Sequence, residues 1–199
     1  MADPISDNAM NTLFRRARSF NDWTDAAVPE VLMRAAYDLA KWGPTSANAS
    51  PARFIFLPKD SDGRERLKPH LLPTNVDKTM TAPWTVILAH DLHFHEKIPE
   101  LFPHFPDAKD WFQDENNRQV NAFRNGTLQS AYFLMAARAL GLDCGPISGF
   151  DNAGVDAEFM TGPRERWRSN WICNIGHGDA SSVFDRSPRL DFDDACIVL

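Results

Sequence analysis

The sequence predicts a single α+β domain in which a small central sheet is flanked by longer helices. Three short apolar segments, at about residues 53–58, 84–90 and 169–176, have the length and composition of strands. Longer segments with helical spacing separate them, an order typical of α+β proteins. The chain has 199 residues, enough for one well-packed domain and marginal for two, so we expect residues 1–199 to form one domain.

Two helices are expected before the first strand. The first spans Ser6–Arg18, because Ser6 can cap its start and its apolar residues recur at helical spacing. The second spans Pro29–Trp42, because proline suits the first turn of a helix and the following apolar residues keep the helical period. A short helix is predicted for Gly63–Leu72, after the first strand.

The second half of the chain contains the longest helical pattern, Asn116–Leu140, which Gly141 ends as a C-cap. It is apolar on most of its circumference, which predicts burial in the core or at a dimer interface. The proline- and aromatic-rich segment Ile98–Asp114 precedes it, and we interpret this as a lid or part of a subunit contact. Short helices are expected at Asn152–Met160 and Asp191–Ala195.

Composition excludes several classes of function. The formal net charge is −6 and the pI is about 5.5, which argues against a nucleic-acid or anionic-membrane surface. No apolar run reaches the roughly 20 residues that a membrane helix needs, and the N-terminus lacks the pattern of a signal peptide. Three cysteines, with no Cys-x-x-Cys pair, suggest reduced thiols and a cytoplasmic location.

Three closely spaced histidines, His90, His93 and His95, invite a zinc interpretation. No acidic or thiol partner is spaced with them, and they follow the second predicted strand. We therefore expect a solvated loop and no metal site.

The segment Trp42–Phe54, WGPTSANASPARF, is a turn rich in short polar groups between two apolar segments. Its hydroxyl, amide and backbone groups could line a pocket for a flat, polar heterocycle. The alternative is a plain connector between a helix and a strand, and such connectors are common. A second turn, Cys144–Asp151 (CGPISGFD), does not match a hydrolase nucleophile elbow, because its serine stands one place too late.

These two segments, together with RNGTLQSAYFLMAARALGLD and the tail SPRLDFDDA, resemble segments of the nitroreductase-like flavoproteins in the same order. The resemblance covers about residues 13–199 and is nearest to the malonic semialdehyde reductases of pyrimidine degradation. It implies a nitroreductase-like fold with a mostly antiparallel sheet, an intertwined homodimer, and FMN sites to which both chains contribute.

The resemblance also implies the residues that bind FMN. A phosphate-binding run corresponds to Arg18, Ser19 and Asn21, although Asn21 replaces the cation usual in the family. Arg189 corresponds to a tail arginine that reaches the phosphate; the alternative is a surface arginine. Asn75 corresponds to an asparagine at the pyrimidine edge, and the alternative is a helix cap. The two turns supply the remaining cofactor-binding residues, which are Pro44, Thr45, Ser46, Asn48, Pro146, Ile147, Ser148 and Gly149.

The implied activity is hydride transfer from NAD(P)H through FMN to a small acceptor, with no protein side chain as the hydride carrier. Malonic semialdehyde would need a cation for its carboxylate, and Arg53 and Arg124 are the candidates; each could equally make an ordinary ion pair. The alternatives are a broad nitroaromatic or quinone reductase, and a flavin-binding protein without turnover. The sequence leaves open whether NADH or NADPH is preferred.

Overall fold

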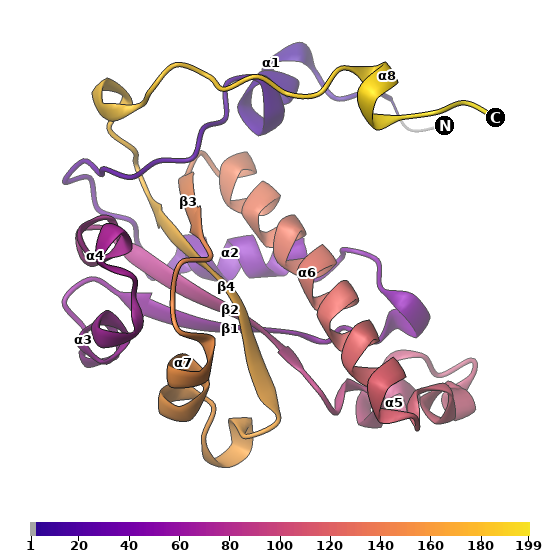
Figure 1. Ribbon diagram of the computed structural model, residues 1–199. Coiled ribbons are helices and arrows are strands. Elements are labelled where there is room, and N and C mark those ends of the chain that lie inside the picture. Colours follow the sequence, from indigo (N-terminus) through magenta and orange to yellow (C-terminus); the bar gives the residue numbers. More distant parts are fainter. Residues whose placement is uncertain (1–2) are drawn as a thin grey trace.

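The computed structural model describes residues 3–199 and contains a four-stranded sheet with helices on both faces (Figure 1). The strands are β1 (Ala52–Pro58), β2 (Trp84–Asp91), β3 (Asp143–Ile147) and β4 (Trp167–Gly176). Their spatial order is β1-β2-β4-β3, and every neighbouring pair is antiparallel. The predicted α+β class with a small antiparallel sheet is therefore confirmed.

Six of the helices overlap predicted helical segments, whereas the short helices Pro73–Met80 and Ile98–Leu101 were not predicted. The helices are α1 (Asp7–Met10), α2 (Glu30–Ala40), α3 (Asp62–Leu67), α4 (Pro73–Met80), α5 (Ile98–Leu101), α6 (Glu115–Ala139), α7 (Asn152–Phe159) and α8 (Phe192–Ala195). None of the helices within residues 3–199 is long and apolar enough to cross a membrane.

Strand β2 lies in the middle of the sheet, and all eight of its residues are buried. Successive side chains of a strand point to opposite faces. Accordingly Val86 and Leu88 join the core beneath α2 and α6, while Ile87 and Ala89 join the core beneath α3 and α7. Burial on both faces explains why this strand is a continuous apolar run rather than an alternating one.

Helices α2 and α6 cover one face of the sheet and pack against each other. Ala36 of α2 and Phe133 and Ala137 of α6 are fully buried there. The outer side of α6 remains uncovered in the single chain, because Val120, Phe123 and Tyr132 are exposed. The single chain therefore accounts for the burial of only one side of this broadly apolar helix.

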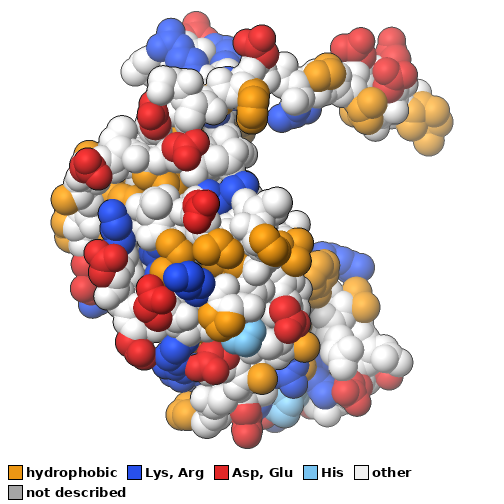
Figure 2. Space-filling model, turned by 60° about the vertical axis from the view of Figure 1, so that its left-hand side comes forward, with side chains coloured by type: hydrophobic (Ala, Val, Ile, Leu, Met, Phe, Trp, Pro, Cys, Tyr) orange, Lys and Arg blue, Asp and Glu red, His pale blue; other side chains and the backbone are white. Residues whose placement is uncertain are grey.

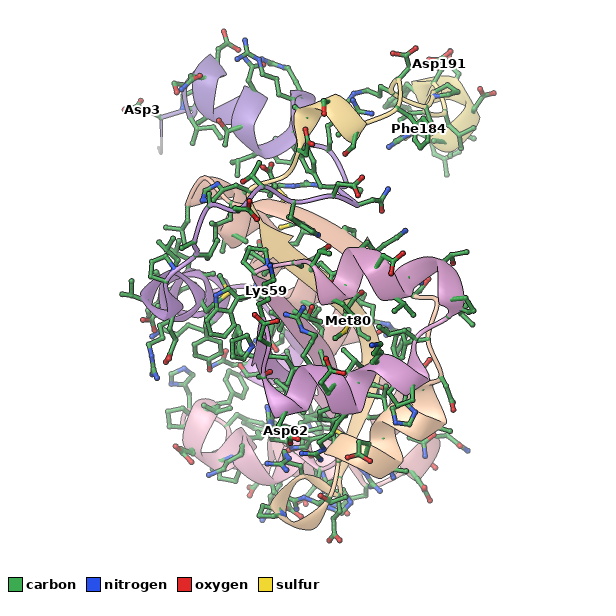
Figure 3. All side chains as sticks on the ribbon, turned by 90° about the vertical axis from the view of Figure 1, so that its left-hand side faces the viewer. Asp3, Lys59, Asp62, Met80, Phe184 and Asp191 are labelled. Carbon is green, nitrogen blue, oxygen red and sulfur yellow. The ribbon has the colours of Figure 1, made fainter. Side chains whose placement is uncertain are left out.

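The opposite face carries α3, α4 and α7 (Figure 3, where Asp62 marks α3 and Met80 marks α4). Arg64 of α3 is fully buried within this layer and makes no ion pair with any of the residues 3–199. Its guanidinium donates to the backbone carbonyls of three residues from different elements, Leu57, Thr79 and Ala82. A buried cation held only by carbonyls is thus a structural link between β1, α3 and the end of α4.

The segment before α7 was predicted as a turn, but residues Asp143–Ile147 form β3. Gly145 and Pro146 obscure the strand in the sequence, because both are uncommon inside sheets. Proline is tolerated here because β3 is an edge strand that pairs only with β4. Gly145 is required, since a Cβ at this position would lie 2.3 Å from the carbonyl oxygen of Phe20.

The expectation of a solvated loop for the three histidines is wrong for His90. This residue belongs to β2 and is buried, with its ring edge-on against Phe123 of α6. Only His93 and His95 follow the strand. Within residues 3–199 no group of three potential ligands is arranged to hold a metal ion.

We expect the stability of the protein to fall as the pH drops below about 6.5, and part of this loss to vanish in His90→Gln. Burial lowers the pKa of His90; Asp156 and Asp91 partly oppose this effect, and Arg168 adds to it. The unfolded chain therefore takes up a proton at a higher pH than the folded chain, so acid favours unfolding. Urea unfolding at pH about 7.5 and about 5.5 measures the loss. An identical loss in both proteins would contradict the assignment.

The C-terminal segment runs away from the body of the molecule (Figure 1), and side chains such as Phe184 and Asp191 project from it (Figure 3). Its last three residues, Ile197, Val198 and Leu199, are almost fully exposed. Hydrophobic side chains therefore gather on an arm that the single chain does not cover (Figure 2).

Candidate functional site

A basic cavity forms where the N-terminal segment meets the C-terminal arm. Its volume is about 460 Å³, and it brings together Arg18, Ser19, Asn21 and Arg189, which lie at opposite ends of the sequence. The main chain fixes this meeting: Ser19 forms a bridge with Cys144 at β3, and Phe20 N–H donates to Cys144 O at 3.1 Å. From the arm, Arg186 donates to the carbonyls of Arg15 and Ala17 at 2.8 and 2.9 Å.

The lining of this cavity has a strong excess of positive charge. Four guanidinium groups line it, those of Arg18, Arg138, Arg186 and Arg189, against the single carboxylate of Asp185. None of the four forms an ion pair within residues 3–199. A guanidinium has five donors in a fixed fork, and carbonyl contacts use only some of them here. The remaining donors suit the oxygens of a phosphate monoester.

Arg138 and Arg186 line the cavity but were not predicted as site residues. Arg138 lies in the last turn of α6, where a cation is favoured by the helix dipole alone, so its sequence position carries no functional signal. Arg186 stands beside Arg189 in the tail, and only the fold of the arm reveals that both face the same cavity.

The predicted residues Asn75 and Gly149 are in direct contact. Asn75 Nδ2 donates to the carbonyl of Gly149 at 2.8 Å, and Leu72 N–H donates to the same oxygen at 3.1 Å. A Cβ on residue 149 would lie 2.5 Å from Asn75 Nδ2, so only glycine allows this approach. Asn75 is not the N-cap of α4, which is Leu72. One of the two N–H groups of Nδ2 is used in this contact, and within residues 3–199 Oδ1 accepts no hydrogen bond.

Asn75, Gly149 and the basic cavity lie along the same edge of the sheet. Pro146 and Ile147 end β3, and Ser148 follows at the surface. The segment that carries Arg18 continues to Trp23, whose Nε1 donates to the carbonyl of Lys78 in α4 at 2.9 Å. Lys78 is one helical turn beyond Asn75 and makes no ion pair within residues 3–199. The Trp23–Lys78 contact therefore joins the segment that carries Arg18 to the helix that carries Asn75.

The Thr45–Asn48 turn lies elsewhere, against the middle of α6. Ser46 N–H donates to Asn125 Oδ1 at 2.9 Å, whereas the basic cavity borders Arg138. At 1.5 Å per residue, Asn125 and Arg138 are about 20 Å apart along the helix axis. The predicted cofactor residues thus form two groups, which one chain does not bring together. Pro44 directly precedes Thr45 and therefore belongs to the second group, that of the Thr45–Asn48 turn.

The backbone of this turn is unusual. Ala47, Asn48 and Ser50 have φ values of 50°, 47° and 43°, in the left-handed region that residues other than glycine avoid at a cost of about 1–2 kcal/mol each. Thr45 Oγ1 accepts from Ser50 N–H at 3.1 Å, and Asn48 Nδ2 donates to the carbonyl of Leu101 in α5 at 2.7 Å. Strain of this kind persists where surrounding contacts impose it, often at functional sites.

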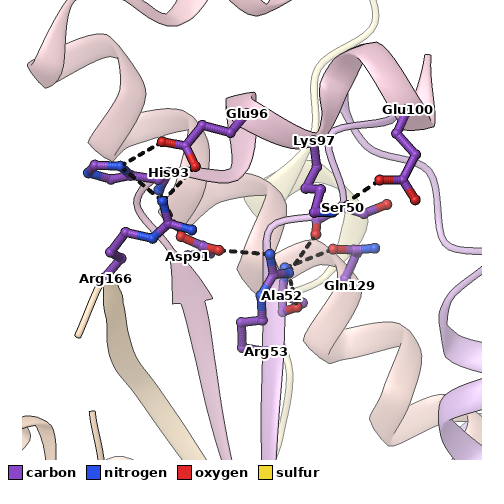
Figure 4. A network of polar contacts seen from close by, with 10 residues as sticks. All are labelled: Ser50, Ala52, Arg53, Asp91, His93, Glu96, Lys97, Glu100, Gln129 and Arg166. Carbon is purple, nitrogen blue, oxygen red and sulfur yellow. Dashed lines mark hydrogen bonds and ion pairs between the residues drawn. The ribbon is translucent and has the colours of Figure 1, made fainter. Parts of the chain in front are cut away.

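Arg53, a predicted substrate-binding residue, makes its contacts inside the protein (Figure 4). Its guanidinium donates to Asp91 Oδ2 at 2.8 Å and to the carbonyls of Ser50 and Ala52 at 3.0 and 2.8 Å. It also borders a second cavity of about 430 Å³, together with Asn48 and Gln129. Arg124, the other candidate, is exposed on the outer side of α6 and makes no ion pair within residues 3–199.

The residues of the first group fit a flavin mononucleotide by their chemistry. The cavity supplies donors for a phosphate ester, and the Asn75–Gly149 contact offers a free amide oxygen beside a closely packed backbone. No side chain in either group has the burial and hydrogen bonding expected of a dedicated general acid.

Comparison with known proteins agrees with this geometry. The model of the nitroreductase family matches residues 14–177. A protein of Xanthomonas oryzae pv. oryzae, provisionally named NADH dehydrogenase/NAD(P)H nitroreductase, is 52% identical over 196 residues, covering 98% of each chain. A protein of Cupriavidus pinatubonensis with the same provisional name is 50% identical over 194 residues, covering 96% of this chain and 97% of its own.

Among solved structures, a nitroreductase-like protein of Exiguobacterium sibiricum in complex with FMN covers 100% of both chains with a TM-score of 0.85 at 18% identity. This likeness shows the shared fold. The match of the family model and the identity to full-length relatives extend over nearly the whole sequence. This chain therefore belongs to the nitroreductase family.

Proposed function

We propose that this protein is an FMN-dependent NAD(P)H oxidoreductase. The observation that supports this proposal most strongly is the basic cavity, which combines four arginines from the N-terminal segment, the end of α6 and the C-terminal arm. The names of the relatives at about 50% identity include NAD(P)H nitroreductase, and a protein of the same fold was solved with FMN. Bound FMN would supply a ring that accepts a hydride from a reduced nicotinamide and passes it on.

The chain's own residues would bind and orient the cofactor. Arg18 and Arg189 would hold the phosphate, with Ser19 and Asn21 beside them, and the missing cation at position 21 would be compensated by Arg138 and Arg186. Asn75 Oδ1 would accept a hydrogen bond from the ring, and the backbone of Pro146–Gly149 would lie against it. We place the protein in the cytoplasm, consistent with the free thiols of Cys144 and Cys173.

We propose a homodimer as the active form, since in one chain the two groups of cofactor residues contact α6 at positions about 20 Å apart along its axis. In a two-fold dimer, the Thr45–Asn48 turn of one chain could complete the site of the other. The exposed apolar residues of α6, such as Phe123, and the uncovered arm ending in Ile197–Leu199 provide surfaces for such a contact. Strand β1 is also an unpaired sheet edge.

The proposed acceptor is malonic semialdehyde, which would be reduced to 3-hydroxypropionate in pyrimidine degradation. Its carboxylate needs a cation, and Arg124 supports this choice better than Arg53, whose charge is balanced by Asp91. The second candidate is a nitroaromatic or quinone acceptor, which the names of the relatives favour. A flavin-binding protein without turnover is the third possibility.

The absorption spectrum of the purified protein and its rates test these proposals. We expect a yellow protein that releases FMN, loses its colour with NADPH or NADH without oxygen, and has twice the mass of the 22.5 kDa chain in solution. If neither nucleotide bleaches the bound flavin, the protein is a flavin-binding protein without turnover, and the proposed oxidoreductase activity is refuted. Faster turnover of a nitroaromatic than of malonic semialdehyde would replace the first acceptor by the second. A colourless monomer that does not bind added FMN would refute the proposal.

A further inference from the structure

One face of α6 holds the strained turn through three residues spaced as a helical stripe. Asn125 Oδ1 accepts from Ser46 N–H at 2.9 Å, and Gln129 Oε1 accepts from Ala52 N–H at 3.0 Å. Tyr132, the third residue, packs so closely on Gly43 that a Cβ there would lie 2.8 Å from its ring. Positions i, i+4 and i+7 of a helix share one side. Tyr132 therefore contacts the start of the turn at Gly43, Asn125 contacts its middle at Ser46, and Gln129 contacts its end at Ala52.

The two amides are almost completely buried, with exposed fractions of 6% and 5%. Their oxygens must face the turn, because a backbone N–H needs an acceptor. Asn125 Nδ2 donates back to the carbonyl of Asn121 in its own helix at 2.9 Å, which fixes the orientation of this amide. Gly126, between them, allows the helix to reach the sheet, since a Cβ would lie 2.8 Å from the Cβ of His90.

The backbone conformation of the turn is strained, and contacts from other elements maintain it. Ala47, Asn48 and Ser50 adopt left-handed conformations without being glycine. If Ser46 and Ala52 lost their acceptors, two half-buried backbone donors would be unsatisfied and the segment between them could leave this conformation. Two other contacts hold only the second half of the turn. Arg53 donates to the carbonyls of Ser50 and Ala52, and Asp91 N–H donates to the carbonyl of Pro51.

We propose that Asn125 and Gln129 are positioning residues for cofactor binding. Neither would touch the flavin; they hold Thr45, Ser46 and Asn48 in the conformation in which these residues meet it. The proposal rests on the proposed function, because it assumes that this turn contacts FMN.

The test uses variants of matched size at each amide in the full-length protein. Gln129→Met removes the acceptor at nearly constant length. Asn125→Leu removes the other acceptor. Asn121→Leu is the control, since within residues 3–199 the side chain of Asn121 bonds only to Asn117, and the backbone carbonyl that accepts from Asn125 is kept. The readouts are FMN affinity by flavin fluorescence, and backbone hydrogen exchange of residues 44–52 without FMN.

We expect Gln129→Met and Asn125→Leu to bind FMN about tenfold more weakly and to exchange faster in residues 44–52, with the sheet protected as before. Asn121→Leu should behave like the wild type. Unchanged exchange and affinity in both acceptor-less variants would overturn the inference. Faster exchange with unchanged affinity would also overturn it, because the turn would then be held without serving the cofactor. A wild type that binds no FMN refutes the proposed function instead.

Discussion

Replacing Arg64 with methionine should destabilise the protein by about 4 kcal/mol, which is a large part of the 5–15 kcal/mol typical of a domain. The guanidinium is fully buried and donates to Leu57 O at 2.7 Å, to Ala82 O at 3.1 Å and to Thr79 O. Methionine fills a similar space but leaves these carbonyls without a donor in a site that excludes water. The unsatisfied acceptors, rather than a lost charge pair, cause the loss.

Urea unfolding with the midpoint and slope fitted separately measures this effect. Arg66→Met is the matched control, because Arg66 lies on the same helix, is half-exposed, and pairs with Glu158 at 2.5 Å at the surface. We expect a much smaller change in that variant. Burial lowers the pKa of Arg64 to about 10, so the side chain still carries its charge at neutral pH. An equal decrease in the free energy of unfolding of Arg64→Met and Arg66→Met would show that the buried contacts to carbonyls stabilise the protein no more than the surface ion pair does.

Removing Arg18 and Arg189 together should weaken FMN binding at least about a hundredfold. Both guanidinium groups line the basic cavity from opposite ends of the chain, and neither is neutralised by a carboxylate within residues 3–199. Each charge-assisted hydrogen bond to a phosphate is stronger than a neutral one, and both would be lost. The double alanine variant should therefore be purified colourless.

Riboflavin, which lacks the phosphate, distinguishes this effect from general damage. Its binding should change little in the double variant, whereas that of FMN should fall. Arg16→Ala serves as the control, because Arg16 lies two residues from Arg18 but does not line the cavity. The affinity of the wild type for FMN should also decrease with salt, since the cavity is open to solvent. Equal losses for FMN and riboflavin would contradict the assignment of this cavity to the phosphate.

The local sequence pattern was sufficient to predict those elements whose burial or ending is encoded in consecutive residues. The run Trp84–Ala89 predicts a strand buried on both faces, and Gly141 predicts the end of α6, where its φ of 80° suits glycine. β3 was missed because Gly145 and Pro146 are present for tertiary reasons: close contact with Phe20, and a place at the sheet edge. His90 was misassigned because its polar ring belongs to a strand and is covered by α6.

The sequence by itself determined the fold class, and its resemblance to known flavoproteins identified the family and a set of candidate cofactor residues. Only the tertiary structure decided how those residues divide between a basic cavity and a distant turn. It also revealed Arg138, Arg186, Asn125 and Gln129, which carry no local signal. The physical reason is that helical and strand periods are local properties of the chain, whereas a site depends on which distant backbones the core brings together.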